Sequence, residues 1–209
     1  EYEAIFTNPN KSKIFLGEQN LKKFSRLKVI CTASTGTNHI DLDYCKKKNI
    51  KVISITRDKN VINKISSTAE LAFALTLSSI RNLIPAYLDV QSKNWDYEKF
   101  IGRQMNYLNV GIIGYGRLGK LFHKYCKSFG ANVKIFDPYI KNRSNFFTSL
   151  NKLLKNSDVI SFHIHANNNY KFLDRTKLNL MKKNVIIVNT SRGEIIDEKA
   201  VVAFLKKNK

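Results

Sequence analysis

The chain has 209 residues, 43% of them hydrophobic, which is enough to bury the core of one large domain or of one and a half. Its formal net charge of +20 raises the question of nucleic-acid binding, but the lysines stand in short groups without a Gly/Arg-rich tail, so we interpret them as solvated surface. No apolar run is long enough to cross a bilayer, and the three cysteines form neither a metal spacing nor a disulfide framework, so we expect a cytoplasmic protein without membrane or metal.

The first part of the chain alternates short strands with helices. The stretch 35–50 is predicted to be a turn followed by a helix, and 56–66 lacks a clean pattern. We therefore predict a domain junction near residues 60–66, with a first domain over residues 1–65. Strands of this first domain are predicted at 3–7, 27–34 and 51–55.

The longest helical pattern in the chain covers residues 66–93. Ser67 and Glu70 are three positions apart and predict a capping box at its start. Pro85 is expected to kink or end this helix near its middle, because proline removes a backbone hydrogen bond and clashes with the preceding turn. Trp95 follows in a polar stretch and is interpreted as core or interface packing rather than as a ligand contact.

The alternation of strands and helices restarts after residue 109. Strands separated by helical segments predict a doubly wound parallel sheet of the Rossmann type, here over residues 66–209. Its strands are predicted at 110–114, 131–137, 158–164 and 184–190. Its later helices are predicted at 117–130, 149–157, 174–183 and 197–209.

The stretch VGIIGYGRLG places Gly114, Gly116 and Gly119 in a G-x-G-x-x-G pattern, between a predicted strand and a predicted helix. The first glycine allows a tight turn, the second lets the backbone approach a pyrophosphate, and the third lets the helix pack close to the strand. The amino end of the helix then offers N–H groups and a positive dipole end to the phosphates. This pattern predicts a dinucleotide site.

Asp137 ends the next predicted strand, 137 − 114 = 23 residues after the first glycine. An acid near that offset hydrogen-bonds a ribose 2′-hydroxyl and repels a 2′-phosphate, which favours NAD over NADP. The alternative is a turn-forming or capping role for Asp137 before Pro138. Arg143 is close in sequence and would weaken the preference for NAD. A methyltransferase can share a glycine-rich loop and an acid, but it does not predict the later part of the chain.

Three stretches together resemble one family, the NAD-dependent D-isomer-specific 2-hydroxyacid dehydrogenases, which include phosphoglycerate, glycerate, D-lactate and formate dehydrogenases. GIIGYGRLGK with IFDPY resembles the nucleotide-binding half of that family. ASTGTNHIDLD and SSTAELAFALTLSSIRN resemble the end of its substrate domain and the helix that enters the cofactor domain. The most specific similarity is SDVISFHIH with LDRTKLNLMKKNVIIVNTSRGEIIDEKAV. The resemblance covers nearly the whole chain.

This resemblance implies a Rossmann NAD-binding domain at 66–209, preceded by the C-terminal part of a flavodoxin-like substrate domain at 1–65. It also implies hydride transfer between NAD(H) and C2 of a 2-hydroxy or 2-oxo acid, and a homodimer, to which the apolar helix from Ser67 and Trp95 are expected to contribute. The chain begins with Glu1 and stops at Lys209 in mid-pattern, so we expect it to be truncated at both ends.

By motif match, the resemblance makes Arg192 the substrate-binding arginine. A planar guanidinium can bridge the carboxylate and carbonyl of a 2-oxo acid and stabilise the charge that develops during reduction. The alternative is an arginine at a strand end that pairs with Glu194 or Asp197 at the surface. The other implied contacts are the amides of Thr35 and Gly36 to the substrate carboxylate, the amides of Arg117 and Leu118 to the pyrophosphate, and His163 and Thr190 along the nicotinamide side.

Two departures from the family pattern stand out. His165 occupies a position where proline is common, and none of the four histidines lies in the motif of the catalytic His, which with its partner Glu is expected beyond Lys209. A non-catalytic NAD-binding regulatory protein of the corepressor type, which shares this fold, therefore remains an alternative to an enzyme. A basic nucleic-acid-binding module is the third interpretation.

Overall fold

The computed structural model describes residues 2–9, 14–140, 144–166 and 168–207. The chain divides into two compact units, Glu1–Ile65 and Ser66–Lys209. Each unit contains its own parallel sheet and its own buried core.

The unit Glu1–Ile65 contains three parallel strands in the order β1-β2-β3. The strands are β1 (Ala4–Thr7), β2 (Val29–Thr32) and β3 (Lys51–Ser54). The short helices are α1 (Glu18–Leu21), α2 (Leu42–Lys47), η1 (Ile55–Arg57) and α3 (Lys59–Ile62). Asp41 caps α2, because its carboxylate accepts the Tyr44 N–H at 2.9 Å. Ile30 of β2 lies at the centre of the core, where it is fully buried.

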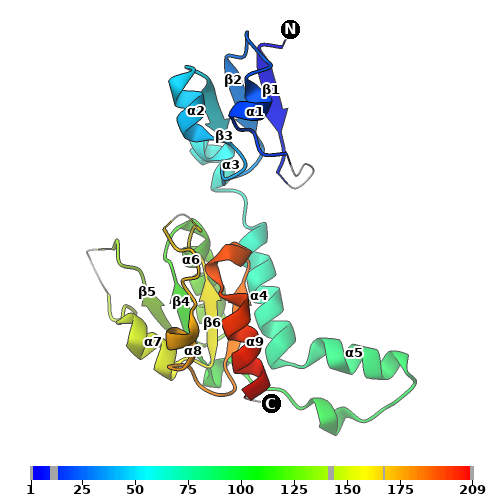
Figure 1. The fold of residues 1–209 in the computed structure, drawn as a ribbon. Helices are drawn as coiled ribbons and strands as arrows, with labels where there is room; N and C mark the ends of the chain where they lie inside the picture. Colours follow the sequence, from blue (N-terminus) through cyan, green and yellow to red (C-terminus); the bar gives the residue numbers. More distant parts are fainter. Residues whose placement is uncertain (1, 10–13, 141–143, 167, 208–209) are drawn as a thin grey trace. The chain divides into compact units, whose positions relative to one another are not determined.

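The unit Ser66–Lys209 contains four parallel strands in the order β5-β4-β6-β7 (Figure 1). The strands are β4 (Asn109–Ile113), β5 (Asn132–Phe136), β6 (Val159–Phe162) and β7 (Ile186–Asn189). Phe147 adds a single parallel bridge to Ile135 on the outer side of β5, so the segment after β5 continues the sheet there. The predicted doubly wound parallel sheet is confirmed.

Helices cover both faces of this sheet. The helices are α4 (Ser67–Ile80), α5 (Leu83–Gln91), η2 (Tyr97–Phe100), η3 (Met105–Tyr107), α6 (Arg117–Ser128), α7 (Leu150–Asn156), α8 (Arg175–Leu178), η4 (Gly193–Ile195) and α9 (Glu198–Lys207). One core joins α4 and α6 to the sheet around Phe122, and a second joins α7, α8 and α9 around Phe162. Because the strands are covered on both sides, they are almost continuously apolar.

The long helix predicted over 66–93 is two helices. Helix α4 ends at Ile80, Asn82 has a left-handed backbone with φ of 52°, and α5 begins at Leu83. The break precedes Pro85, which thereby lies in the first turn of α5, where a missing N–H costs no hydrogen bond. The predicted interruption at this proline is confirmed, and α5 projects away from the sheet (Figure 1).

One prediction about this region is wrong in detail. The predicted capping box of Ser67 and Glu70 does not form, because the helix begins one residue earlier than the motif requires. Ser66 is the capping residue, and its hydroxyl donates to the Glu70 carboxylate. Trp95 is 84% exposed in the single chain, which excludes the core, while its predicted packing at an interface stays a prediction.

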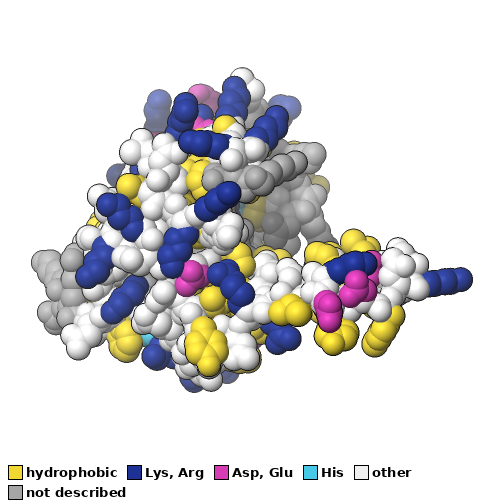
Figure 2. Space-filling view, turned by 90° about the horizontal axis from the view of Figure 1, so that it is seen from below, with side chains coloured by type: hydrophobic (Ala, Val, Ile, Leu, Met, Phe, Trp, Pro, Cys, Tyr) yellow, Lys and Arg dark blue, Asp and Glu magenta, His cyan; other side chains and the backbone are white. Residues whose placement is uncertain are grey.

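Within the described residues, no single helix has the length and apolar character needed to cross a bilayer. The pair Lys59–Ile80 and Leu83–Gln91, which is bent by 65°, reaches that length and apolar composition only when its two helices are taken together. Lysine and arginine side chains are spread over the face seen in Figure 2. No group of three or more potential metal-ligating side chains is found in the part of the chain that the structure describes.

Candidate functional site

The carboxyl ends of four parallel strands meet along one edge of the sheet in Ser66–Lys209. The chain passes from β4 to β5 on one side and later returns to β6 on the other side of β4. Ligands of open α/β sheets bind in the crevice at such a switch of strand order. Gly114, Asp137, His163 and Thr190 each follow one of these strands, so the structure places the predicted cofactor residues along this edge.

The glycine loop follows β4. Gly114 has a φ of +93°, and a Cβ there would stand 2.5 Å from the carbonyl oxygen of His163, so only glycine fits. A Cβ on Gly119 would collide with the carbonyl oxygen of Gly114. Gly116 is different, because a Cβ there would meet nothing within 4 Å. No neighbouring atom among the described residues therefore requires a glycine at position 116. A glycine is expected there if a ligand approaches the backbone closely.

Helix α6 begins immediately after Gly116. The capping residue provides no side-chain acceptor, and the first turn contains no acidic residue. The first amides of an α-helix have no acceptor within the helix, and Arg117 and Leu118 contribute two of them. The positive end of the helix dipole lies at the same place, so this turn fits the phosphates of a dinucleotide.

Asp137 follows β5 and is half-buried beside the glycine loop. Its Oδ2 accepts the N–H of Tyr115 at 2.7 Å, and its Oδ1 accepts the N–H of Tyr139 at 2.9 Å. The turn-forming role considered from the sequence is therefore present. An ionised carboxylate offers about four acceptor positions, so capacity for a ribose hydroxyl remains. Arg143 lies outside the described residues.

His163 lies at the end of β6 and its ring points inward. Its Nε2 is 2.9 Å from the Ser161 hydroxyl, and its ring packs on Phe122 with centroids 4.9 Å apart. Burial lowers the pKa of His163 to about 4, so the ring is neutral at neutral pH. Thr190, after β7, has a buried hydroxyl without a hydrogen-bond partner among the described residues.

Arg192 extends from a turn that its neighbours hold in place. The Asn189 side chain donates to the Arg192 carbonyl at 2.8 Å and accepts the Ser191 N–H at 3.0 Å. The Ser191 hydroxyl donates to the carbonyl of Phe162 at 2.8 Å, which anchors the turn to the end of β6. Sequence reasoning missed Asn189 and Ser191, whose only signal was a polar run directly after a buried strand.

The Arg192 side chain itself is exposed and forms no ion pair within the part of the chain that the structure describes. Its Nη1 donates only to the carbonyl of the adjacent Ser191, at 2.8 Å. Asp197, one of the two candidate ion-pair partners, instead pairs with Lys171 at 3.7 Å and caps α9 through the Ala200 N–H. The guanidinium therefore keeps its fork of donors for a ligand.

Thr35 and Gly36 belong to the other unit, in the loop after β2. The Ser34 hydroxyl donates to the Gly36 carbonyl at 2.5 Å. The Thr32 hydroxyl lies 2.9 Å from the Ser34 hydroxyl and 3.1 Å from Nε2 of His39, so it links these two side chains. Across the residues described here, the N–H groups of Thr35 and Gly36 donate to no acceptor. The loop is held by its side chains while both amides stay available.

Comparison with known proteins adds a family to this geometry. Residues 73–209 match the NAD binding domain of the D-isomer specific 2-hydroxyacid dehydrogenases. The D-3-phosphoglycerate dehydrogenase of Methanocaldococcus jannaschii is 34% identical over 90% of this chain and 36% of its own length. The D-lactate dehydrogenase of Escherichia coli is 33% identical over 100% of this chain and 63% of its own length.

Solved structures agree with this match. D-lactate dehydrogenase from Aquifex aeolicus, complexed with NAD and lactic acid, is 34% identical with a TM-score of 0.85, and the match covers 99% of this chain and 62% of that one. The NAD-dependent formate dehydrogenase from Staphylococcus aureus, also in complex with NAD, is 26% identical with a TM-score of 0.87 over 99% and 62%. The chain thus spans from about a third to less than two thirds of the length of these relatives. Since the family match covers more than half of its residues and includes the glycine loop and the Arg192 turn, the chain belongs to the D-isomer-specific 2-hydroxyacid dehydrogenases.

Proposed function

We propose that the protein containing this chain is an NAD-dependent oxidoreductase that transfers a hydride between the cofactor and C2 of a small 2-hydroxy or 2-oxo acid. The observation that carries the proposal is the Arg192 turn, which is fixed to the end of β6 while the guanidinium has no ion-pair partner among the described residues. The cofactor would accept the hydride as NAD+ or donate it as NADH, and the residues of this chain would bind and orient the cofactor.

The cofactor contacts follow from the glycine loop. The pyrophosphate would lie over Gly116 and against the first amides of α6, including those of Arg117 and Leu118, and Asp137 would accept from the adenosine ribose. His163 and Thr190 would lie toward the nicotinamide. NAD is preferred over NADP because a 2′-phosphate next to Asp137 adds a second anion. Similar kcat/KM values with NADH and NADPH, or a preference unchanged by Asp137→Ala, would contradict this preference.

Substrate binding would combine two kinds of donor. The Arg192 fork can hold the carboxylate and the carbonyl together, which a lysine cannot do with the same geometry. As the carbonyl is reduced its oxygen becomes more negative, so a fixed cation stabilises the transition state more than the bound substrate. The amides of Thr35 and Gly36 would hold the carboxylate, and residues 1–65 would be part of the substrate domain.

His163 is not assigned the proton transfer. Its Nε2 is bonded to the Ser161 hydroxyl, its ring packs on Phe122, and its low pKa keeps it neutral. The acid/base His and Glu that the family resemblance implies are therefore assigned to no residue of this chain.

A non-catalytic NAD-binding protein would share the glycine loop. The relatives named above are dehydrogenases, which supports the enzyme instead. The deciding experiment is to purify the full-length protein and follow NADH oxidation with a panel of small 2-oxo acids. NADH binding without turnover of any 2-oxo acid would favour the non-catalytic alternative.

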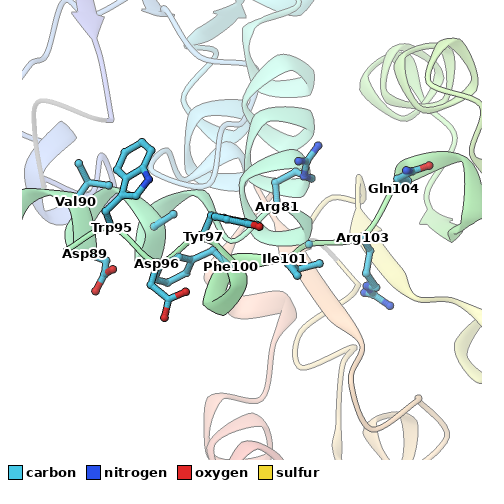
Figure 3. A pocket seen from close by; sticks show the side chains of 12 residues that line it. Arg81, Asp89, Val90, Trp95, Asp96, Tyr97, Phe100, Ile101, Arg103 and Gln104 are labelled. Carbon is cyan, nitrogen blue, oxygen red and sulfur yellow. The ribbon is translucent and has the colours of Figure 1, made fainter.

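We also propose a homodimer that buries the arm formed by α5 and η2. No residue of α5 is buried, and Leu83, Ile84, Tyr87 and Leu88 are all more than half exposed. The arm bears apolar side chains around a cavity of about 480 Å³, lined in part by Trp95, Tyr97 and Phe100 (Figures 2 and 3). A second copy would cover these side chains. A full-length protein that sediments as a monomer at micromolar concentration would contradict the proposal.

A further inference from the structure

Tyr115 lies between Gly114 and Gly116, at the centre of the glycine loop. Glycine on both sides gives the backbone at this point more conformational freedom than any other pair of neighbours would. A loop that must present amides to a ligand binds more tightly when it is ordered beforehand. The side chain of Tyr115 is therefore the part of the loop best placed to restrict it.

Both ends of Tyr115 are fixed. Its N–H donates to the Asp137 carboxylate at 2.7 Å, and its hydroxyl is 2.7 Å from Nδ1 of His123, in the middle of α6. The other ring nitrogen of His123, Nε2, is buried and has no partner among the described residues. Within that part of the chain, the His123 ring therefore forms a single hydrogen bond, the one to Tyr115.

Packing supports the same arrangement. The Tyr115 ring meets Phe147 edge to face with centroids 5.5 Å apart, and Lys120 Nζ lies 5.9 Å from its centroid. The His123 ring packs in turn on Phe146, at 5.0 Å. The pair thus joins the glycine loop, α6 and the segment beside β5. Burial raises the pKa of Tyr115, while burial and the charge of Lys127 lower the pKa of His123, so both are neutral at neutral pH.

We propose that His123 is a positioning residue for the dinucleotide: its bond to the Tyr115 hydroxyl holds the glycine loop so that Gly116 stays open and Asp137 keeps its orientation toward the ribose. The inference rests on the proposed NAD site and adds to it a residue that contacts no ligand. It acts on cofactor affinity and not on hydride transfer, which involves the other end of NAD.

The test uses the full-length protein and titrates NADH by its fluorescence. Tyr115→Phe removes the hydroxyl alone, and His123→Phe removes its partner while keeping an aromatic ring. Each is expected to raise the Kd for NADH roughly three- to tenfold, the effect of one ordinary hydrogen bond. The double variant is expected to bind no more weakly than either single variant, because both remove the same bond. The kcat of His123→Phe at saturating NADH is expected to stay unchanged, because His123 contacts no ligand.

Tyr125→Phe is the matched control, since Tyr125 belongs to α6, like His123, and packs on Phe73 without a hydrogen bond from its hydroxyl among the described residues. This variant is expected to bind NADH like the wild type. An unchanged Kd in Tyr115→Phe, or costs of the two single variants that add in the double, would overturn the inference while leaving the NAD site intact. Absence of NADH binding by the wild type would instead overturn the proposed function. If His123→Phe does not fold, the inference is tested with Tyr115→Phe and His123→Gln. The glutamine retains a hydrogen-bond acceptor for the Tyr115 hydroxyl, so His123→Gln is expected to bind NADH nearly normally.

Discussion

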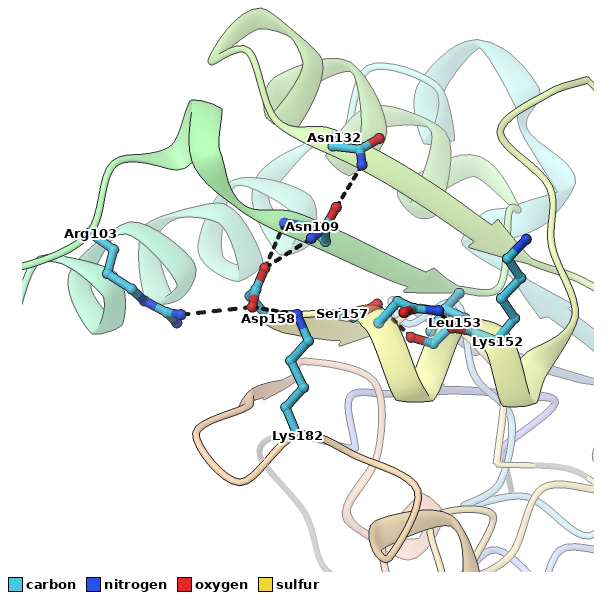
Figure 4. Close-up of polar contacts among 9 residues, drawn as sticks. Arg103, Asn109, Asn132, Lys152, Leu153, Ser157, Asp158 and Lys182 are labelled. Atoms are coloured by element: carbon cyan, nitrogen blue, oxygen red, sulfur yellow. Dashed lines mark hydrogen bonds and ion pairs between the residues drawn. The ribbon is translucent and has the colours of Figure 1, made fainter.

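At the amino edge of the sheet in Ser66–Lys209, Asp158 accepts hydrogen bonds from the Asn109 N–H at 2.9 Å and from Lys182 at 2.8 Å, with Arg103 at 3.9 Å (Figure 4). At the carboxyl edge of the same sheet, Arg192 has no ion-pair partner and the Thr190 hydroxyl no hydrogen-bond partner among the described residues. The same strands contribute to both edges. Polar groups at the first edge are satisfied within the protein, while several at the second remain available for a ligand.

The comparison teaches how to separate structural from functional polar residues. A polar group that costs free energy when left unpaired is normally paired in a folded chain. Substitutions at the amino edge should therefore change stability, and substitutions of the available groups at the carboxyl edge should change binding or turnover.

The largest effect is expected for Arg192→Lys. The charge is kept but the two-pronged donor is lost, so kcat/KM should fall by roughly two powers of ten or more, about 3 kcal/mol of transition-state binding. The Kd for NADH should hardly change, since the cofactor is proposed to bind at the glycine loop. Steady-state kinetics and NADH titration of the full-length protein measure both. Loss of NADH binding with turnover preserved would assign Arg192 to the wrong ligand.

His163 is an exception at the carboxyl edge, because its Nε2 is already bonded to Ser161 within the protein, and it sharpens the comparison. Its folded pKa of about 4 lies below the ordinary value, so the unfolded chain takes up a proton first as the pH falls. Stability is thus fully present above about pH 6.5 and decreases down to about pH 4, by up to about 3 kcal/mol. Urea unfolding at several pH values measures this slope. A His163→Gln variant that keeps the same slope would show that another group is responsible.

Asp158→Asn tests the amino edge. Burial alone would raise the pKa of Asp158, but hydrogen bonds from Lys182 and Asn109 and the charges of Lys182 and Arg103 outweigh it and lower the pKa. The carboxylate therefore stabilises the fold above about pH 4, and this contribution is lost as the pH falls further. We expect the substitution to cost about 2 kcal/mol of unfolding free energy near neutral pH. Kinetic constants should be normal, and a variant with unchanged stability but altered KM would break the comparison.

The smallest effect is expected within the glycine loop. Gly116→Ala should leave thermal unfolding unchanged, because the added methyl group meets nothing within 4 Å, yet weaken NADH binding about tenfold, or 1.4 kcal/mol. Gly119→Ala is the matched variant and should destabilise the fold, since its methyl group collides with the backbone of Gly114. Equal NADH affinity for the wild type and Gly116→Ala would contradict the proposal that the cofactor approaches the backbone closely at Gly116.

The sequence was informative where the signal is local or periodic. The strand and helix alternation predicted the parallel sheet, and the spacing of Gly114, Gly116 and Gly119 predicted the loop after β4. It was uninformative where a side chain takes a partner from a distant segment. Ser191 anchors to Phe162, 29 residues away, and Asp158 pairs with Asn109, 49 residues away.

One detail of the prediction was incorrect, at the start of α4. The Ser67–Glu70 spacing fits a capping box, but the helix begins at Ser67, so Ser66 is the capping residue and its hydroxyl is bonded to Glu70. The packing of the His163 ring on Phe122 is another contact between distant segments, which the strand pattern of 158–164 does not reveal.

Helix α5 has nine residues and buries none of them. A helix this short, without a covered apolar face, is unstable in water, because the cost of nucleation is not recovered. In the proposed homodimer a second copy would cover this arm, and the helicity of α5 would then depend on protein concentration. Amide hydrogen exchange in Leu83–Gln91 should slow as the full-length protein is concentrated, while exchange in β4 stays constant. An exchange rate in the arm that is independent of concentration would show that the single chain alone keeps α5 folded.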